Sequence, residues 1–116
     1  MKLLMNILKK NDKLNIDNRI ISNYQIRQKL KEECDEVLQE LINYSENADL
    51  VNLKDIVRET FDLIQICILI LWRCHRDAKE IEEPDLIQEI NLEHKDKLIS
   101  QRAWKPLTGI EIDIKE

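Results

Sequence analysis

Residues 59–72 read ETFDLIQICILILW, and this stretch decides the fold of the chain. From Phe61 to Trp72, apolar side chains fall on nearly every side of a helix, and a helix of that kind is surrounded on every face. The longest apolar run, from Leu63 to Trp72, is interrupted by Gln65 and is about half as long as a bilayer crossing requires. A chain of 116 residues with few helices can hardly enclose such a segment alone. We therefore expect a second subunit to complete the core.

Composition predicts an all-α protein. The chain contains one Gly and two Pro, too few for the many turns of a sheet protein. Aromatic residues make up only 4% of it, so the core must be built from Ile and Leu. Its length suits one domain, which we assign to residues 1–116, with a core at about 22–104 and peripheral segments at 1–21 and 105–116.

Charge and cysteine usage narrow the class of protein. The formal net charge is −5 at pH 7, without the excess of Lys and Arg that DNA- and RNA-binding proteins show. Cys34, Cys67 and Cys74 are an odd number without paired spacing, so we interpret them as small core residues and not as a disulfide framework. The N-terminal segment has no signal-peptide cleavage site. We expect a cytoplasmic protein outside the membrane.

The spacing of apolar residues predicts two long helices. Ser22 and Gln25 form a capping-box pattern that begins the first helix, which should end between residues 44 and 47. Asn52 is the expected N-cap of the second helix, which should run to about Lys79.

A third helix follows, with Pro84 in its first turn, where the missing N–H of proline costs nothing. It should end between residues 102 and 104. Residues 1–21 are expected to form a short helix or a turn at most. In residues 110–114 apolar and acidic residues alternate, which is typical of a short strand or of an arm that docks on another subunit.

The first helix carries acidic residues three positions apart. Glu33 and Glu36 lie with Glu40 in a stripe beside the apolar stripe, whereas Glu32 points away from the core. Two carboxylates at this spacing share one helix face and can bind a common cation. Taken alone, however, the pair resembles any solvated helix face.

Glu59 and Asp62 repeat this spacing on the second helix, in a more unusual context. Asp62 shares its side of the helix with Ile66 and Leu69, so we expect its carboxylate on a largely buried face. A buried charge is costly unless something compensates it, and a divalent cation would do so. Two acidic pairs on consecutive helices that are built for packing therefore predict a shared metal site.

Oxygen ligands alone select hard cations. Mg²⁺ prefers a few carboxylates together with water and substrate phosphates, and Mn²⁺ can use the same set. Zinc would need His or Cys, but neither Cys74 nor His75 has a second partner at ligand spacing. The chain also lacks a Gly-rich phosphate loop and a G-x-S-x-G motif, which excludes P-loop enzymes and serine hydrolases.

Together, Glu32 to Glu36 and Glu59 to Asp62 resemble the EExxE…ExxD pattern of the MazG-like all-α nucleotide pyrophosphohydrolases. The flanking Lys29-Leu30 and Leu63-Ile64 fit this pattern, and His94 to Arg102 is similar to the Lys…Arg segment near the end of that family's domain. The resemblance covers roughly residues 24–104. It implies a MazG-like helical bundle, of the four-helix type, that is shared between chains.

Carried over by position, the Mg²⁺ ligands and catalytic residues that the resemblance implies are Glu33, Glu36, Glu59 and Asp62. Glu36 is the candidate general base. Lys97 and Arg102 would bind substrate phosphate, although basic residues near a helix C-terminus also interact favourably with the helix dipole. The implied enzyme is a homodimer or homotetramer that cleaves a nucleoside triphosphate between the α and β phosphates, releasing a monophosphate and pyrophosphate.

Two other functions fit the same residues. A non-catalytic helical dimerisation or regulatory module would share the fold, but Mg²⁺ would not change its thermal stability. A phosphoribosyl-ATP pyrophosphohydrolase has a similar helical fold and acidic motif, and substrate profiling separates it from a triphosphate-cleaving enzyme. The base and sugar of the substrate are left open, as is the role in the cell.

Overall fold

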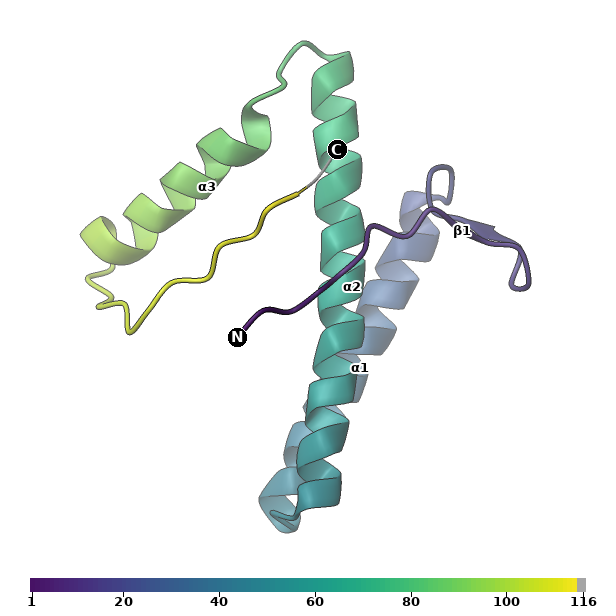
Figure 1. Cartoon of the computed structure of the whole chain (residues 1–116), viewed down its shortest axis with the longest axis vertical. Coiled ribbons are helices and arrows are strands. Elements are labelled where there is room, and N and C mark those ends of the chain that lie inside the picture. Colours follow the sequence, from purple (N-terminus) through teal and green to yellow (C-terminus); the bar gives the residue numbers. More distant parts are fainter. Residues whose placement is uncertain (115–116) are drawn as a thin grey trace. The chain divides into compact units, whose positions relative to one another are not determined.

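The computed structural model describes residues 1–114 (Figure 1). It is mostly helical, as predicted, with a small hairpin near the N-terminus. In chain order the elements are strands β1 (Lys10–Asn11) and β2 (Ile16–Asp17), helices α1 (Asn23–Glu46), α2 (Leu50–Glu80) and α3 (Leu86–Asp96), and the π-helical turn η1 (Lys97–Gln101).

The described chain divides into two compact units. The first runs from Met1 to Asp77 and the second begins at Ala78. The first unit holds the hairpin, α1 and most of α2, while the second holds α3 and η1. The assignment of all 116 residues to a single domain stays a prediction, and the last two residues of the peripheral segment 105–116 lie outside the described residues.

Helix α1 begins where the sequence predicts. The Ser22 hydroxyl accepts a hydrogen bond from the backbone N–H of Gln25 at 3.1 Å, and the Gln25 side chain accepts one from the backbone N–H of Ser22 at 2.9 Å. This complete capping box satisfies donors that the first turn of a helix leaves unpaired. The helix ends at Glu46, inside the predicted range, with Asn47 as its C-cap.

Helix α2 begins earlier than predicted, because Asp49 and not Asn52 provides the capping oxygen. The Asp49 carboxylate accepts a hydrogen bond from the backbone N–H of Asn52 at 2.8 Å. The Asn52 side chain instead donates to the backbone oxygen of Asn47 at 2.8 Å and so closes the link between α1 and α2. The end of the helix at Glu80 agrees with the prediction.

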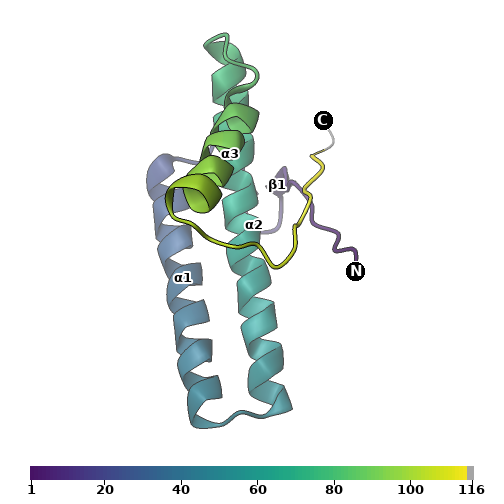
Figure 2. The ribbon, with the colours of Figure 1, turned by 90° about the vertical axis from the view of Figure 1, so that its left-hand side faces the viewer.

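Helices α1 and α2 pack side by side in opposite directions, joined by a short link (Figure 1, Figure 2). Their contact centres on Ile26 from α1 and on Ile66 and Leu69 from α2, which are buried. Five partly buried residues surround these three: Ile21, Leu30, Leu63, Ile70 and Trp72. Within residues 1–77 no other apolar side chain is buried, so the core of this unit is thin.

One consequence of the thin core is that two of the three cysteines are not core residues. Cys34 is half-buried, but Cys67 and Cys74 are exposed, so the prediction was wrong for these two. Within the first unit α1 is the one helix that packs along α2, and the N-terminal segment adds hydrogen bonds to Gln65 and Arg76 of α2. All three thiols are free.

The N-terminal segment forms a hairpin, which corrects the expectation of a short helix or turn. Strands β1 and β2 are antiparallel, with Lys10 opposite Asp17. The turn between them contains Asn15 at φ 53°, a left-handed conformation that Asn tolerates better than most residues. The segment is tied to α2, because Arg76 donates to the backbone oxygen of Arg19 at 2.7 Å.

In the second unit, α3 begins at Leu86, so Pro84 precedes the helix and does not lie in its first turn. Helix α3 continues directly into η1, and Arg102 is the C-cap of η1, which agrees with the predicted end. Residues 110–114 form no strand. Within the described part of the chain, none of the helices combines the length and apolar character needed to cross a bilayer.

Candidate metal centre

Four carboxylates of α1 and α2 meet in the first unit. Each offers one oxygen, and these oxygens all lie within 4.8 Å of one another. We call this group the acidic cluster, and its members are Glu33, Glu36, Glu59 and Asp62. The prediction that these four side chains converge is confirmed, while their role as metal ligands stays a prediction.

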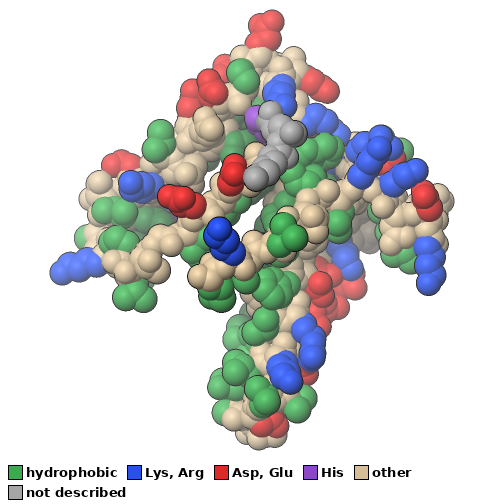
Figure 3. All heavy atoms as spheres, in the orientation of Figure 1, with side chains coloured by type: hydrophobic (Ala, Val, Ile, Leu, Met, Phe, Trp, Pro, Cys, Tyr) green, Lys and Arg blue, Asp and Glu red, His purple; other side chains and the backbone are tan. Residues whose placement is uncertain are grey.

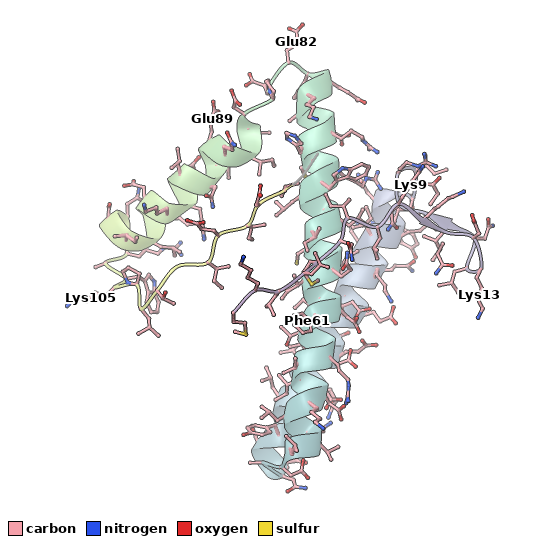
Figure 4. All side chains as sticks on the ribbon, in the orientation of Figure 1. Lys9, Lys13, Phe61, Glu82, Glu89 and Lys105 are labelled. Carbon is pink, nitrogen blue, oxygen red and sulfur yellow. The ribbon has the colours of Figure 1, made fainter. Side chains whose placement is uncertain are left out.

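Local helix geometry explains why the cluster forms. A spacing of three residues puts Glu33 and Glu36 on one face of α1, and the same spacing puts Glu59 and Asp62 on one face of α2. The antiparallel packing of the two helices then brings the pairs to the same level. Phe61, which lies between the α2 pair in the sequence, marks this level midway along α2 (Figure 4).

Glu33 is the buried member of the cluster, with only 4% of its surface exposed. One of its oxygens, Oε1, accepts a hydrogen bond from the Lys29 ammonium group at 2.8 Å. The other, Oε2, is buried and has no hydrogen-bond partner. Leaving a buried carboxylate oxygen unpaired is costly, and this is the kind of orphaned acceptor that a cation would satisfy.

Glu36 interacts with acids of both helices. Hydrogen bonding to Glu59, and then to Glu33, raises the pKa of Glu36 from 4.5 to about 7, and loss of hydration adds to the shift. The cause is that several carboxylates in one small volume cannot all be ionised without a compensating positive charge. The raised pKa of Glu36 favours its protonated form from acidic pH up to about neutrality when no cation is bound.

Burial within the cluster differs from the prediction. Asp62 was expected on a largely buried face, but its side chain is exposed. The buried acid is Glu33 of α1. The reason is that α2 packs against a single helix in this unit, so Asp62 lies on an open side although the nearby Ile66 is covered.

Other acidic residues of α1 lie outside the cluster. Glu32 has a side chain that is 58% exposed, as its place on the helical wheel predicts. Glu40, which shares the stripe of Glu33 and Glu36, accepts a hydrogen bond from the Asn43 side chain at 3.3 Å and is not a member of the cluster.

Lys97 and Arg102 belong to the second unit, whereas the acidic cluster lies in the first. Lys97 is the C-cap of α3 and Arg102 is the C-cap of η1. Both therefore lie at the C-terminal end of a helical segment, where a basic residue is favourable without any substrate. Their binding of phosphate stays a prediction.

Lys29 has no role predicted from the sequence, yet its ammonium group lies 2.8 Å from the buried acid Glu33. The signal was present in the sequence, because Lys29 and Glu33 are four residues apart and such pairs meet on a helix surface. The sequence alone does not show that the carboxylate of this pair is buried, whereas that of the similar pair of Lys31 and Asp35 is exposed.

The acidic cluster fits a hard divalent cation such as Mg²⁺ or Mn²⁺. Its donors are carboxylate oxygens only, which such ions prefer, and no His or Cys belongs to it. A cation would also pair the orphaned oxygen of Glu33 and replace the proton held at Glu36. A single divalent cation would therefore relieve both unfavourable features of the cluster.

Comparison of this chain with family models, curated proteins and solved structures gave no match. The resemblance to the MazG-like enzymes therefore rests on the sequence motifs and on the helical setting of the acidic residues.

Proposed function

We propose that this protein is a Mg²⁺-dependent nucleoside triphosphate pyrophosphohydrolase of the MazG-like type. The reaction would convert an NTP or dNTP to its monophosphate and pyrophosphate, in nucleotide house-cleaning or pool control in the cytoplasm. One observation carries the proposal: the carboxylates of an EExxE…ExxD pattern meet across two antiparallel helices, with oxygens within 4.8 Å of one another.

The residues proposed to hold Mg²⁺ are the four members of the acidic cluster. When bound, the ion would neutralise phosphate charge and make a water molecule a stronger nucleophile. Because the cluster is acidic, it would repel a triphosphate without such an ion. The dependence on a divalent cation is thus a direct consequence of the donor set.

Glu36 is the proposed general base, because it contacts acids of both helices and its half-exposed carboxylate is accessible to water. The water oxygen forms a bond to phosphorus at the α–β linkage, and the bridging P–O bond breaks. Glu36 takes the proton of the water, and the electron pair of the broken bond leaves with the departing phosphate group. Lys97 and Arg102 are proposed to offset charge on the phosphates.

A homodimer or homotetramer is part of the proposal. In the first unit, large apolar side chains of both helices are exposed, and apolar atoms (green) gather over the part of α2 nearest the link to α1 (Figure 3). Toward the link between the two helices, the exposed residues are Leu38, Leu41, Ile42, Leu50, Val51, Leu53 and Val57. Exposed apolar surface on this scale is typical of a surface that another protein covers.

The test is to incubate the protein with a panel of canonical and modified nucleoside triphosphates and to separate the products by chromatography. We expect monophosphate and pyrophosphate with Mg²⁺ and neither with chelator. Glu59→Gln should abolish the products. Asp55→Asn removes one negative charge from the same helix, where Asp55 pairs with Arg58 at 2.8 Å outside the cluster, and should leave them unchanged.

Other outcomes would redirect or end the proposal. Release of inorganic phosphate alone would contradict cleavage at the α–β linkage. Turnover of phosphoribosyl-ATP with no turnover of triphosphates would assign the cluster to that reaction. An inactive protein whose thermal stability does not respond to Mg²⁺ would favour a non-catalytic assembly module.

A further inference from the structure

Lys29 is the one basic residue that the structure pairs with the acidic cluster among the described residues. Its ammonium group lies 2.8 Å from Oε1 of Glu33 and 3.6 Å from the exposed Glu32. The Lys29 side chain is about half exposed, at 54%, whereas that of Glu33 is 5% exposed. The ion pair thus joins a solvent-accessible cation to a buried carboxylate.

Burial makes this pair different from an ordinary surface ion pair. Lys31 and Asp35 have the same spacing on the same helix, and their charged atoms are 2.6 Å apart, but both side chains are exposed at 79% and 58%. Exposed pairs of this kind constrain little, because water can replace either partner. Glu33 differs, since Lys29 is the one cation that the structure pairs with its carboxylate among the described residues, and the buried Oε2 has no hydrogen-bond partner.

We propose that Lys29 is a positioning residue for the metal site, which fixes the orientation of the Glu33 carboxylate by engaging one oxygen and leaves the other for the cation. This inference rests on the proposed metal site. Partners of this type, which contact a ligand and not the metal, commonly decide how a ligand is aimed. Lys29 is not a catalytic residue, because it acts through Glu33.

The positive charge of Lys29 has the opposite effect on metal binding, because it repels a cation. A monovalent cation about 5 Å from a divalent one weakens its binding about fivefold in water-like surroundings at physiological salt. If Lys29 acted only through its charge, removing it would therefore strengthen Mg²⁺ binding. Removing a group that orients a ligand has a net cost of about 10–100-fold in metal affinity. The two roles predict changes of opposite sign.

The experiment is calorimetric titration of the full chain with MgCl₂, without nucleotide. Lys29→Met should weaken Mg²⁺ binding about 10–100-fold relative to wild type. Lys29→Arg, which keeps the charge and the donor, should stay within about threefold of wild type. Lys31→Met is the matched control, because it removes the same charge two residues away, and it should also stay within about threefold.

A double-mutant cycle tests whether Lys29 acts through Glu33. In a Glu33→Gln chain, adding Lys29→Met should change Mg²⁺ affinity by less than about twofold. Far-UV circular dichroism in EDTA verifies that each variant is helical. If Lys29→Met destroys the helical signal, Lys29→Arg is compared with wild type in the same titration. A loss of Mg²⁺ affinity above about tenfold in Lys29→Arg would then overturn the proposal.

The outcomes separate this inference from the proposed function. Wild-type protein that binds no Mg²⁺ would overturn both. Wild-type protein that binds Mg²⁺, with Lys29→Met binding equally well or more tightly, would overturn the positioning role alone. If Lys29→Met weakens Mg²⁺ binding as much in the Glu33→Gln chain as in wild type, Lys29 does not act through Glu33.

Discussion

Replacing Asp62 by Asn should raise the stability of the metal-free protein and lower it, relative to wild type, once Mg²⁺ is present. Without a cation, the Asp62 carboxylate is repelled by its neighbours, because one of its oxygens lies within 4.8 Å of oxygens from the other three acids. With Mg²⁺, the same carboxylate is a proposed ligand, and its loss should weaken binding. The variant is therefore expected to be more stable than wild type without a cation and less stable than wild type with Mg²⁺.

The magnitude follows from the geometry. Two unit charges at 4.8 Å repel each other by about 0.9 kcal/mol at the dielectric constant of water, the appropriate value because Asp62 is exposed. The repulsions of Asp62 by Glu33 and by Glu59 are added, and their sum is halved for screening at physiological salt. Losing this repulsion should stabilise the metal-free protein by about 1 kcal/mol. For a chain of this size that is about 4 °C in Tm.

Binding of Mg²⁺ is expected to have the larger effect on wild type. Free Mg²⁺ at 100 times its Kd stabilises a protein with one site by about 2.7 kcal/mol, which corresponds to about 10 °C here. Asp62→Asn loses one of the four proposed ligands, so at the same Mg²⁺ concentration it should gain only a small part of this stabilisation.

Thermal unfolding followed by far-UV circular dichroism, in EDTA and in MgCl₂, measures both effects. Asp55→Asn is the control, because it loses a negative charge on the same helix and only the exposed pair with Arg58. It should lose about 0.5 kcal/mol or less in either buffer and keep the full response to Mg²⁺. The reasoning is refuted if Asp62→Asn is less stable than wild type in EDTA, or if Mg²⁺ stabilises both proteins equally.

Three further predictions concern the first unit. Ile66→Ala should lower the free energy of unfolding by about 2–3 kcal/mol in urea titrations. This value is near the lower end for such changes, because the core is thin and the site can partly collapse. No measurable change would contradict the packing of α1 on α2. Ser22→Ala should cost about 1 kcal/mol in the same assay, whereas Ser45→Ala, on the exposed surface of the last turn of α1, should cost less than half as much. In EDTA, Tm should fall as the pH rises from about 4.5 to about 7, because the pKa of Glu36 is raised from 4.5 to about 7 in the folded chain and its stabilising proton is lost across that range. Glu36→Gln should make the fall of Tm with rising pH shallower. An unchanged slope of Tm against pH would contradict a proton shared at Glu36.

The features that could be predicted from the sequence are those set by local spacing. The capping box of Ser22 and Gln25 fixes the start of α1 within one turn of chain. The meeting of the four carboxylates follows from two i,i+3 pairs on consecutive helices, once a short link makes those helices antiparallel. Neither inference needs a contact between distant parts of the chain beyond the packing of neighbouring helices.

Competing local signals explain the errors at the start of α2 and in the N-terminal segment. Asp49 and Asn52 are both good capping residues, and spacing alone does not decide between them. The strands of the hairpin have two residues each, too few for an alternating pattern to be visible. Its turn relies on Asn15 in a left-handed conformation, which one residue type only weakly indicates.

Burial could not be predicted, because it depends on how many neighbours each helix has. The apolar pattern of residues 61–72 predicts covered faces all around this part of α2, but in the first unit α1 is the one helix that packs along it. Asp62 and Cys67 are therefore exposed, and the buried acid is Glu33. For the same reason the ion pair between Lys29 and Glu33 had no visible importance in the sequence.

The most direct test of the metal site is a crystal structure with Mn²⁺ and a nonhydrolysable nucleoside triphosphate, using anomalous scattering to locate the ion. We predict an anomalous peak in direct contact with carboxylate oxygens from both α1 and α2, at the acidic cluster, with phosphate oxygens on its open side. An empty cluster in crystals that hold the nucleotide, or a Mn²⁺ peak bound only at other residues, would contradict the account.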